Sequence, residues 1–114
     1  MEKHLLSGGT APMAATCLRF ATVYGVASRM RFDLTVNEFT RELWADRELE
    51  VFGEQFWRPY VHVRDAARAT RMVLDAGPES TGHEVFNVGH TDENYRKLDL
   101  VRIISGQVDR GTVR

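Results

Sequence analysis

The chain has 114 residues, 43% of them apolar and 27% charged, which is ordinary for one soluble globular domain. Its 15 basic and 16 acidic residues leave a net charge of −1, which argues against broad electrostatic binding to nucleic acid or to an anionic membrane. No stretch reaches the roughly 20 apolar residues of a membrane helix, and no signal peptide is visible. Cys17 is the only cysteine, so an internal disulfide is excluded and a reducing, cytoplasmic location is expected.

The first thirty residues predict one buried strand between glycine-marked turns. Met1–Ser7 has the pattern of the end of a helix, closed by Gly8 and Gly9 as C-cap glycines. Ala14–Phe20 is short and mostly apolar, as in a parallel strand that is buried on both faces. It leads to Gly25, which indicates a turn, and Val26–Arg31 is expected to be a loop.

The next segment predicts a helix followed by a two-stranded ribbon. Asp33 is expected to N-cap a helix over Leu34–Asp46, whose apolar residues fall on one side. Glu48–Phe52 alternates polar and apolar side chains, which indicates a strand with one face in water. Tyr60–Val63 is the second strand, and Pro59 before it favours a strand start or a sheet edge.

A helix with the clearest pattern in the chain follows this ribbon. Asp65 begins it, and we expect Asp65 to be its N-cap residue. Its inner, apolar side is predicted to include Val73 and Leu74, and Gly77-Pro78 ends it. Glu84–Val88 is then predicted to be another brief apolar strand.

The last part predicts a turn at Asp92–Arg96, a helix over Leu98–Val108 and a frayed end over Asp109–Arg114. Two apolar strands alternate with helices, so we predict an α/β fold with two parallel core strands, an inserted two-stranded ribbon and three main helices. A pair of parallel strands leaves open edges. The chain is therefore expected either to assemble with itself or to belong to a larger sheet.

Arg58 is the main candidate for a ligand-binding residue. It stands between Trp57 and Tyr60, where a planar guanidinium could grip phosphate oxygens in a bidentate way. The alternative is an arginine that stabilises the ribbon through a cation–π contact or a salt bridge. Thr22 and Tyr24 follow the first apolar strand, and ligands of open α/β sheets gather at the carboxyl ends of strands. For Tyr24 the alternative is a packed aromatic ring.

The remaining polar candidates are weaker. Arg29 and Arg31, beside Asp33, could bind an anion near a helix N-terminus, although such arginines are more often solvated or paired with a carboxylate. His62 lies in an apolar strand and is expected to be packed rather than catalytic. The spacing indicates no metal site and no catalytic residue. The other histidines are scattered, at His4, His83 and His90.

Four sequence blocks, taken in order, resemble one protein family. They are Leu18-Arg19-Phe20-Ala21-Thr22-Val23-Tyr24-Gly25, Arg29-Met30-Arg31-Phe32-Asp33-Leu34 with Asn37, Arg58-Pro59-Tyr60-Val61-His62-Val63-Arg64-Asp65, and Phe86-Asn87-Val88-Gly89. Together they are similar to the C-terminal half of the extended short-chain dehydrogenase/reductase family, the NAD(P)-dependent nucleotide-sugar epimerases and dehydratases. The resemblance runs from about Met1 to about Ser105.

The resemblance implies a Rossmann-like epimerase fold of which residues 1–114 form the C-terminal, substrate-binding part as a single domain. Members carry a Gly-x-x-Gly-x-x-Gly loop for the dinucleotide and a catalytic Tyr-x-x-x-Lys pair, and neither motif occurs in these 114 residues. No NAD(P) is therefore expected to bind this chain alone. Because hydride transfer needs a held nicotinamide and a proton-transferring group, we do not expect the chain alone to catalyse the family reaction.

The resemblance also implies contacts with a substrate. Arg58 corresponds to the arginine that grips the substrate diphosphate, and Asn37 corresponds to a substrate-contacting asparagine. Thr22 stands where the family often has asparagine. The alternative for Asn37 is a simply exposed residue in the first turn of its helix.

Three hypotheses of function follow from these expectations. In the first, the chain is a truncated epimerase/dehydratase-like protein that binds a nucleoside diphosphate sugar weakly through Arg58, Asn37 and Thr22. In the second, it is a non-enzymatic module that forms a homo-oligomer through exposed sheet edges or apolar faces. In the third, a separate polypeptide supplies the missing half and restores an enzyme.

Overall fold

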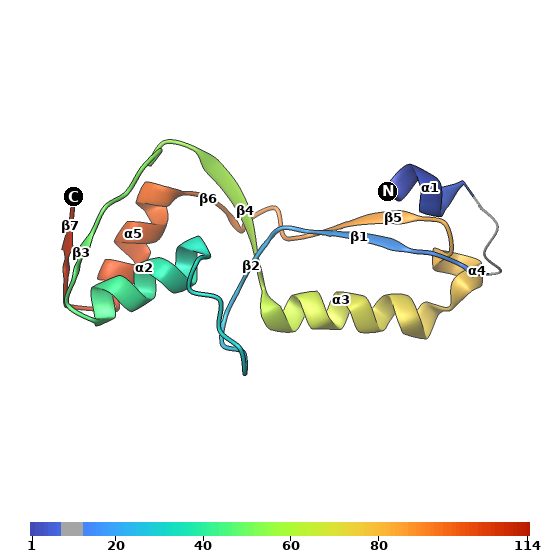
Figure 1. Cartoon of the computed structure of the whole chain (residues 1–114), viewed down its shortest axis with the longest axis horizontal. Coiled ribbons are helices and arrows are strands. Elements are labelled where there is room, and N and C mark those ends of the chain that lie inside the picture. Colours follow the sequence, from blue (N-terminus) through green and yellow to red (C-terminus); the bar gives the residue numbers. More distant parts are fainter. Residues whose placement is uncertain (8–12) are drawn as a thin grey trace.

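A computed structural model describes residues 1–7 and 13–114, so the expected capping by Gly8 and Gly9 lies outside the described residues. The molecule is elongated, with extents of 54 × 27 × 23 Å (Figure 1). Its radius of gyration is 17.8 Å, against about 13 Å for a compact chain of this length. The α/β class is confirmed, because parallel strands are combined with helices along the chain.

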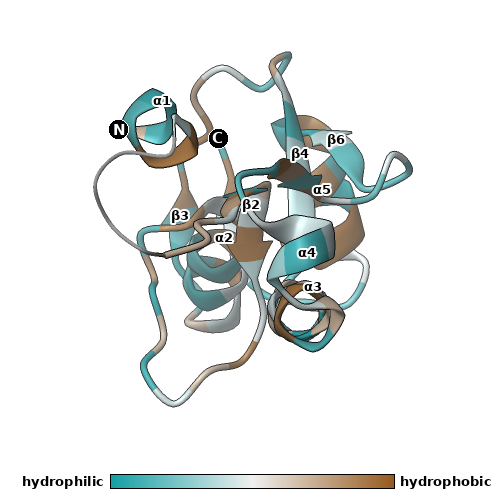
Figure 2. Cartoon of the chain, turned by 90° about the vertical axis from the view of Figure 1, so that its right-hand side faces the viewer, coloured by the Kyte–Doolittle hydropathy of each residue, from teal (hydrophilic) through white to brown (hydrophobic). Residues whose placement is uncertain are grey.

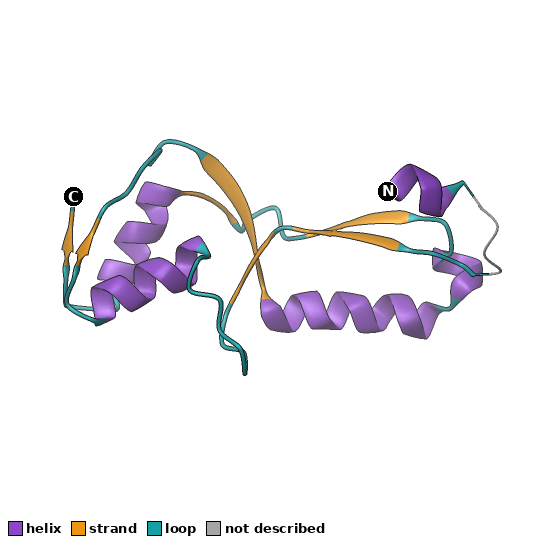
Figure 3. Ribbon diagram, viewed as in Figure 1, coloured by secondary structure: helices purple, strands orange, loops and turns teal. Residues whose placement is uncertain are grey.

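One end of the molecule is built on two parallel strands, β1 (Cys17–Phe20) and β5 (Val85–Val88), which confirms the predicted parallel pair. The expected burial of the first strand on both faces is wrong, because no residue of β1 is buried. Figure 3 shows helix α3 (Val63–Ala76) running along one face of this pair and the short α1 (Glu2–Leu6) lying on the other side. Helix α4 (Pro78–Thr81) joins α3 to β5. We call these five elements, α1, β1, α3, α4 and β5, the arm.

A three-stranded sheet connects the arm to the rest of the chain. Its order is β2 (Thr22–Tyr24), β4 (Trp57–His62) and β6 (Asn94–Arg96). The second half of β4 pairs in parallel with β2, and its first half pairs antiparallel with β6. Pro59 faces Asn94 of β6, and in the part of the chain that the structure describes β4 has no second neighbour at this residue, as expected for proline at a sheet edge.

The other end, which we call the head, comprises α2 (Thr35–Trp44), β3 (Glu48–Leu49), α5 (Lys97–Ser105) and β7 (Thr112–Val113). Helices α2 and α5 pack against each other, with Tyr60 of β4 beside them. The hydrophobic core of the molecule lies here. Its buried members are Phe39, Leu43, Leu49, Tyr60, Leu100, Val101 and Ile104.

The expected two-stranded ribbon is wrong. Within Glu48–Phe52 only Glu48–Leu49 is a strand, and it pairs with Thr112–Val113, not with the segment Tyr60–Val63. The chain end expected to fray is therefore held in a sheet, where Arg114 N–H donates to Leu49 O at 2.9 Å. The predicted turn at Asp92–Arg96 instead contains β6. Partners distant in sequence decided both outcomes, because a two- or three-residue strand has no periodicity of its own.

Two expected helix caps are also wrong. Asp33 does not cap α2, because its carboxylate pairs with the Arg31 guanidinium, and Leu34 occupies the N-cap position without a side-chain bond. Helix α3 begins at Val63, so Asp65 lies within the first turn. The cap is His62, whose Nδ1 accepts from Arg64 N–H at 3.2 Å.

Helix α3 buries fewer apolar side chains than its sequence pattern predicted. Ala66 is its one buried residue, and Leu74, expected on the inner side, is 76% exposed. Figure 2 views the arm end-on and shows both apolar and polar residues around the circumference of α3. The helix does end at Gly77, as predicted. No helix in the described part of the chain is both long and apolar enough to cross a membrane.

Candidate functional site

The guanidinium of Arg58 is exposed on the first half of β4. It forms no hydrogen bond and no ion pair with any side chain of residues 1–7 or 13–114. The cation over the Trp57 ring belongs to Arg96, whose Cζ is 5.4 Å from the ring centroid. Among the described residues Arg58 thus has neither the cation–π contact nor the salt bridge of the alternative interpretation, and its charge stays available to a ligand.

Tyr60 lies two residues beyond Arg58, so both side chains point to the same face of β4. Its side chain is 1% exposed, and its hydroxyl has no partner with hydrogen-bond geometry among the described residues. Burial raises the pKa of Tyr60, while the nearby Thr35 hydroxyl and the charge of Arg58 lower that pKa to a smaller extent. The Thr35 hydroxyl therefore lies near the Tyr60 hydroxyl, and the charge of Arg58 acts on that hydroxyl from the same face of β4.

Thr35 is the first residue of α2, so this hydroxyl also marks the position of a helix N-terminus. No side chain caps that terminus, because Leu34 is apolar and Asp33 is held by Arg31. The first-turn N–H groups of a helix carry partial positive charge and favour an anion. The uncapped helix start and the free guanidinium of Arg58 thus lie on the side of β4 that carries Tyr60, and both are suited to phosphate, whereas the Tyr60 hydroxyl itself is buried.

Thr22 and Tyr24 lie on β2, the neighbour of the second half of β4. Thr22 pairs with Tyr60 and Tyr24 pairs with His62. The Tyr24 ring meets the His62 ring edge-on, with centroids 5.3 Å apart. Burial raises the pKa of Tyr24, and Glu93, Tyr95 and Asp65 raise it further. Thr22 therefore stands beside the Arg58–Tyr60 face, whereas Tyr24 is partly packed at the far end of the strand.

Asn37 lies in the first turn of α2 and is bonded on both sides of its amide. Its Oδ1 accepts from Gly25 N–H at 3.3 Å, and its Nδ2 donates to Arg31 O at 3.0 Å. These bonds fasten the loop between residues 25 and 31 to the helix. The sequence pointed to the residue but not to this role, since nothing in the spacing shows which backbone groups its amide reaches.

A cavity of about 570 Å³ lies between α3 and the segment after β5, beside the ends of β2 and β4. It is bordered by Tyr24, His62, Asp65, Arg68, His90 and Glu93. His62 serves here as the cap of α3 and the partner of Tyr24, which matches the expected packed role. Among the described residues no three of His, Cys, Asp or Glu are grouped to hold a metal ion.

Two residues of the phosphate-suited arrangement were missed by sequence reasoning, Tyr60 and Thr35. A signal was present for Tyr60, because residues two apart in a strand share a face and the expected strand began at this residue. No signal placed Thr35, since its position depends on how α2 packs against β4.

Comparisons with known proteins agree with this architecture. Residues 5–89 match the NAD dependent epimerase/dehydratase family. The UDP-glucose 4-epimerase of Thermus thermophilus, solved with NAD, has a TM-score of 0.79 at 21% identity over 98% of this chain and 37% of that one. The UDP-glucose 4-epimerase of Thermotoga maritima, solved with UDP-glucose, has a TM-score of 0.69 at 27% identity over 85% and 31%.

A third similar structure is the UDP-glucuronic acid 4-epimerase of Bacillus cereus, solved with UDP-glucuronic acid and NAD. Its TM-score is 0.72 at 25% identity, over 85% of this chain and 30% of that one. The chain thus spans about a third of the length of the solved structures that it matches. The family match covers well over half of the chain, and the fold agrees with it, so this chain belongs to the NAD-dependent epimerase/dehydratase family.

Proposed function

We propose that this chain forms the part of an epimerase/dehydratase-family site that binds the diphosphate of a nucleoside diphosphate sugar. The observation that carries the proposal is the unpartnered Arg58 guanidinium, on the same face of β4 as the unpartnered Tyr60 hydroxyl. The uncapped start of α2 at Thr35 adds backbone donors to the same place. Two of the similar structures contain UDP-glucose or UDP-glucuronic acid, which fits this class of ligand.

Each group would act on the phosphates in a distinct way. The fork of Arg58 can donate two parallel hydrogen bonds to oxygens of one phosphate. The first N–H groups of α2 can donate to a second oxygen with the helix dipole aligned. In this proposal Thr22, on the strand beside Tyr60, contacts the remainder of the ligand, together with Tyr24 at the end of that strand. Asn37 contributes by holding the loop between residues 25 and 31.

We assign no NAD contact to this chain alone. The phosphates of a dinucleotide need a glycine-rich turn between a strand and a helix. No such turn joins a strand to a helix among residues 13–114, and the sequence holds no Tyr-x-x-x-Lys pair for proton transfer. The residues present therefore do not fit the cofactor, and no step of hydride transfer is derived from them.

Titration calorimetry with UDP-glucose tests the proposal on the whole chain. We expect Arg58→Ala to weaken binding about tenfold to a hundredfold, because a charge-assisted hydrogen bond contributes about 1.5–3 kcal/mol. Arg64→Ala is the matched control, since Arg64 is also an arginine without an ion pair among the described residues. Equal affinity in the two variants, or no binding by the unmodified chain, would overturn the proposal.

Self-association is a second candidate function, favoured by the surface of the arm. The accessible surface is 8572 Å², whereas a compact protein of 13.0 kDa exposes about 6,300 Å². The excess of about 2,300 Å² is well above the roughly 800 Å² that each partner buries in an ordinary interface. Large exposed apolar side chains of the arm include Phe20, Met72, Leu74 and Phe86.

Sedimentation equilibrium at micromolar concentration tests this second candidate. We expect an oligomer that dissociates in the Leu74→Asp variant, because a buried unpaired charge opposes association. Val26→Asp is the control, since Val26 is 87% exposed and lies outside the arm. A monomer in the unmodified chain, or equal dissociation by both substitutions, would count against self-association through the arm.

A further inference from the structure

Three consecutive residues at the junction of β6 and α5 hold the segment that leads into β4. The Lys97 Nζ donates to Phe52 O at 2.6 Å, and Leu98 N–H donates to Glu54 O at 3.3 Å. The Arg96 guanidinium stacks on the Trp57 ring, 5.4 Å from its centroid. The start of β4, next to Arg58, is thus fastened to a helix from the far end of the sequence.

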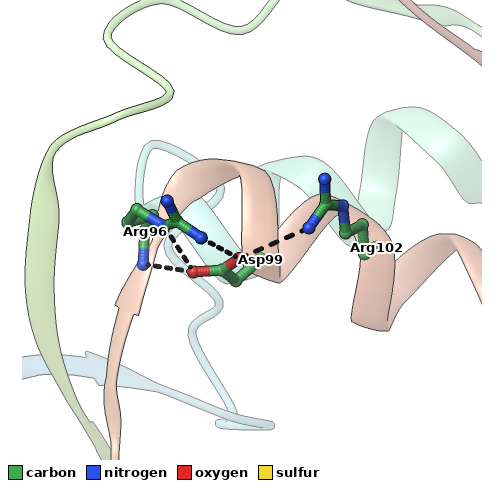
Figure 4. A network of polar contacts seen from close by, with 3 residues as sticks. All are labelled: Arg96, Asp99 and Arg102. Atoms are coloured by element: carbon green, nitrogen blue, oxygen red, sulfur yellow. Dashed lines mark hydrogen bonds and ion pairs between the residues drawn. The ribbon is translucent and has the colours of Figure 1, made fainter.

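Arg96 is itself fixed by one carboxylate (Figure 4). Its Nε donates to Asp99 Oδ2 at 3.0 Å and its Nη2 donates to Oδ1 at 3.2 Å. Its backbone N–H also donates to Oδ2, at 3.2 Å, while Arg102 stands 3.9 Å from Oδ1. Both carboxylate oxygens are engaged, so the Arg96 fork is already occupied and held in one orientation over Trp57.

Arg96 and Arg58 lie on opposite faces of the antiparallel pair. Arg96 is directly opposite Trp57, whereas Arg58 is directly opposite Tyr95. Residues that face each other across a ladder share a face, and successive residues alternate. Arg96 therefore approaches β4 from behind and does not join Arg58 on the same phosphate.

The first half of β4 has little else to hold it. Among the strands of the described residues, β6 alone neighbours it, and Pro59 has no backbone N–H to donate to that strand. The next backbone bond of the ladder runs from Tyr60 N–H to Glu93 O at 2.8 Å. Side-chain contacts on the face opposite Arg58 consequently help to determine the direction in which the Arg58 side chain points.

We propose that Arg96 is a positioning residue for phosphate binding. Stacked on Trp57 and tied to Asp99, it fixes the first half of β4 so that the Arg58 guanidinium stays directed toward the phosphate. Arg96 donates nothing to the ligand, and its effect passes through Arg58. This inference rests on the proposed diphosphate site.

The test compares Arg96→Gln with Arg102→Gln in the whole chain, because Arg102 also borders Asp99 but is not stacked on Trp57. UDP affinity is measured for each in the unmodified and in the Arg58→Ala background. We expect Arg96→Gln to weaken UDP binding about fivefold, the scale of one exposed cation–π contact plus an ion pair. In the Arg58→Ala background the same change should have less than about a twofold effect. Arg96→Lys, which keeps the cation, should restore part of the loss.

Amide hydrogen exchange separates this inference from the proposed function. Arg96→Gln should speed exchange of the Tyr60 amide about fivefold, and Arg102→Gln should leave it unchanged. Equal exchange in the two variants would overturn the positioning role even if UDP binds. An equal loss of affinity with and without Arg58 would also overturn it, by showing an effect that does not pass through Arg58. Absence of UDP binding in the unmodified chain contradicts the proposed function and, with it, a role for Arg96 in phosphate binding.

Discussion

The head and the arm differ in how much apolar surface they bury. In the head, two helices and short strands enclose seven buried hydrophobic residues in one cluster. In the arm, two strands lie between helices, yet the buried residues are only Ala66 and Thr81 among those that the structure describes. An apolar groove of about 380 Å³ remains between α3 and the strands, bordered by Leu18, Met72, Val73 and Phe86.

The difference shows that regular secondary structure does not by itself make a core. The arm contains the longest helix of the described chain and a parallel strand pair in register. A parallel sheet is stable when several strands are covered on both faces. With two strands the apolar side chains Phe20 and Phe86 remain 43% and 38% exposed. The head should therefore hold the stability of this chain, and the arm should depend on a covering partner.

Two leucines give the largest expected contrast. Leu43 in the head is 1% exposed, and Leu74 in the arm is 76% exposed. Leu43→Ala should lower the free energy of unfolding by about 3 kcal/mol, because it removes buried methyl groups and leaves a cavity. Leu74→Ala should lower it by less than about 0.5 kcal/mol. Urea unfolding of the two variants measures both values.

An equal loss of unfolding free energy in Leu43→Ala and Leu74→Ala would contradict the contrast between head and arm. A loss of about 3 kcal/mol in Leu74→Ala would mean that the arm is covered in solution. Repeating the urea titration over a range of protein concentrations then separates a folded monomer from an oligomer, since only the oligomer gains stability with concentration.

Two glycines with a similar positive φ give the next contrast. Gly111 in the head has φ of +74° and Gly77 in the arm has φ of +75°. A Cβ at Gly111 would lie 2.9 Å from Leu43 Cα and 3.0 Å from Arg47 O, whereas a Cβ at Gly77 would meet nothing within 4 Å. Gly77→Ala should cost about 2 kcal/mol from backbone strain alone, because almost only glycine adopts its φ of +75° together with its ψ of +167°. Gly111→Ala should cost about 3–4 kcal/mol, because rigid backbone must also shift.

Thermal and urea unfolding measure these two costs. Equal costs would show that the β3–β7 pair near Gly111 yields easily and is not part of the rigid head. A larger loss of unfolding free energy in Gly77→Ala than in Gly111→Ala would mean that the backbone is more constrained in the arm than in the head.

Sequence patterns predicted the arm better than the head. The apolar runs Ala14–Phe20 and Glu84–Val88 contain β1 and β5, and Gly77-Pro78 marks the end of α3 as expected. These signals are local: a continuous apolar run fits a parallel strand, and a glycine followed by proline ends a helix. What the patterns did not contain was the extent of burial, which depends on how many layers cover each face.

For the proposed site, sequence reasoning named Arg58, Thr22, Tyr24 and Asn37 as candidates but not the contacts that arrange them. Arg58 stood out because it lies between aromatics, but the guanidinium that stacks on Trp57 is that of Arg96, from a distant part of the sequence. The Asp33 carboxylate, expected to cap α2, accepts instead from the guanidinium of Arg31, two residues away. The N-terminus of α2 therefore has no side-chain cap. Such choices between nearby partners are decided by side-chain geometry, which spacing alone does not determine.

Acid titration gives the smallest contrast, between one ion pair in each region. Arg96 holds the pKa of Asp99 below its ordinary value, and Arg19 does the same for the pKa of Glu2 in the arm. A carboxyl whose pKa is lowered by folding stabilises the fold above its unfolded pKa of about 4, and that stability is lost as the pH falls through the lower, folded pKa.

Replacing each carboxylate by its amide compares the two ion pairs directly. Asp99→Asn should reduce the melting temperature at pH 7 and flatten its decline between about pH 5 and pH 2. Glu2→Gln should change both less, because the Glu2 side chain is 40% exposed against 23% for Asp99 and makes no helix cap. Melting curves in this pH range, at low and high salt, measure the two effects. A larger change in Glu2→Gln would mean that the arm, and not the head, depends more on its charged contacts.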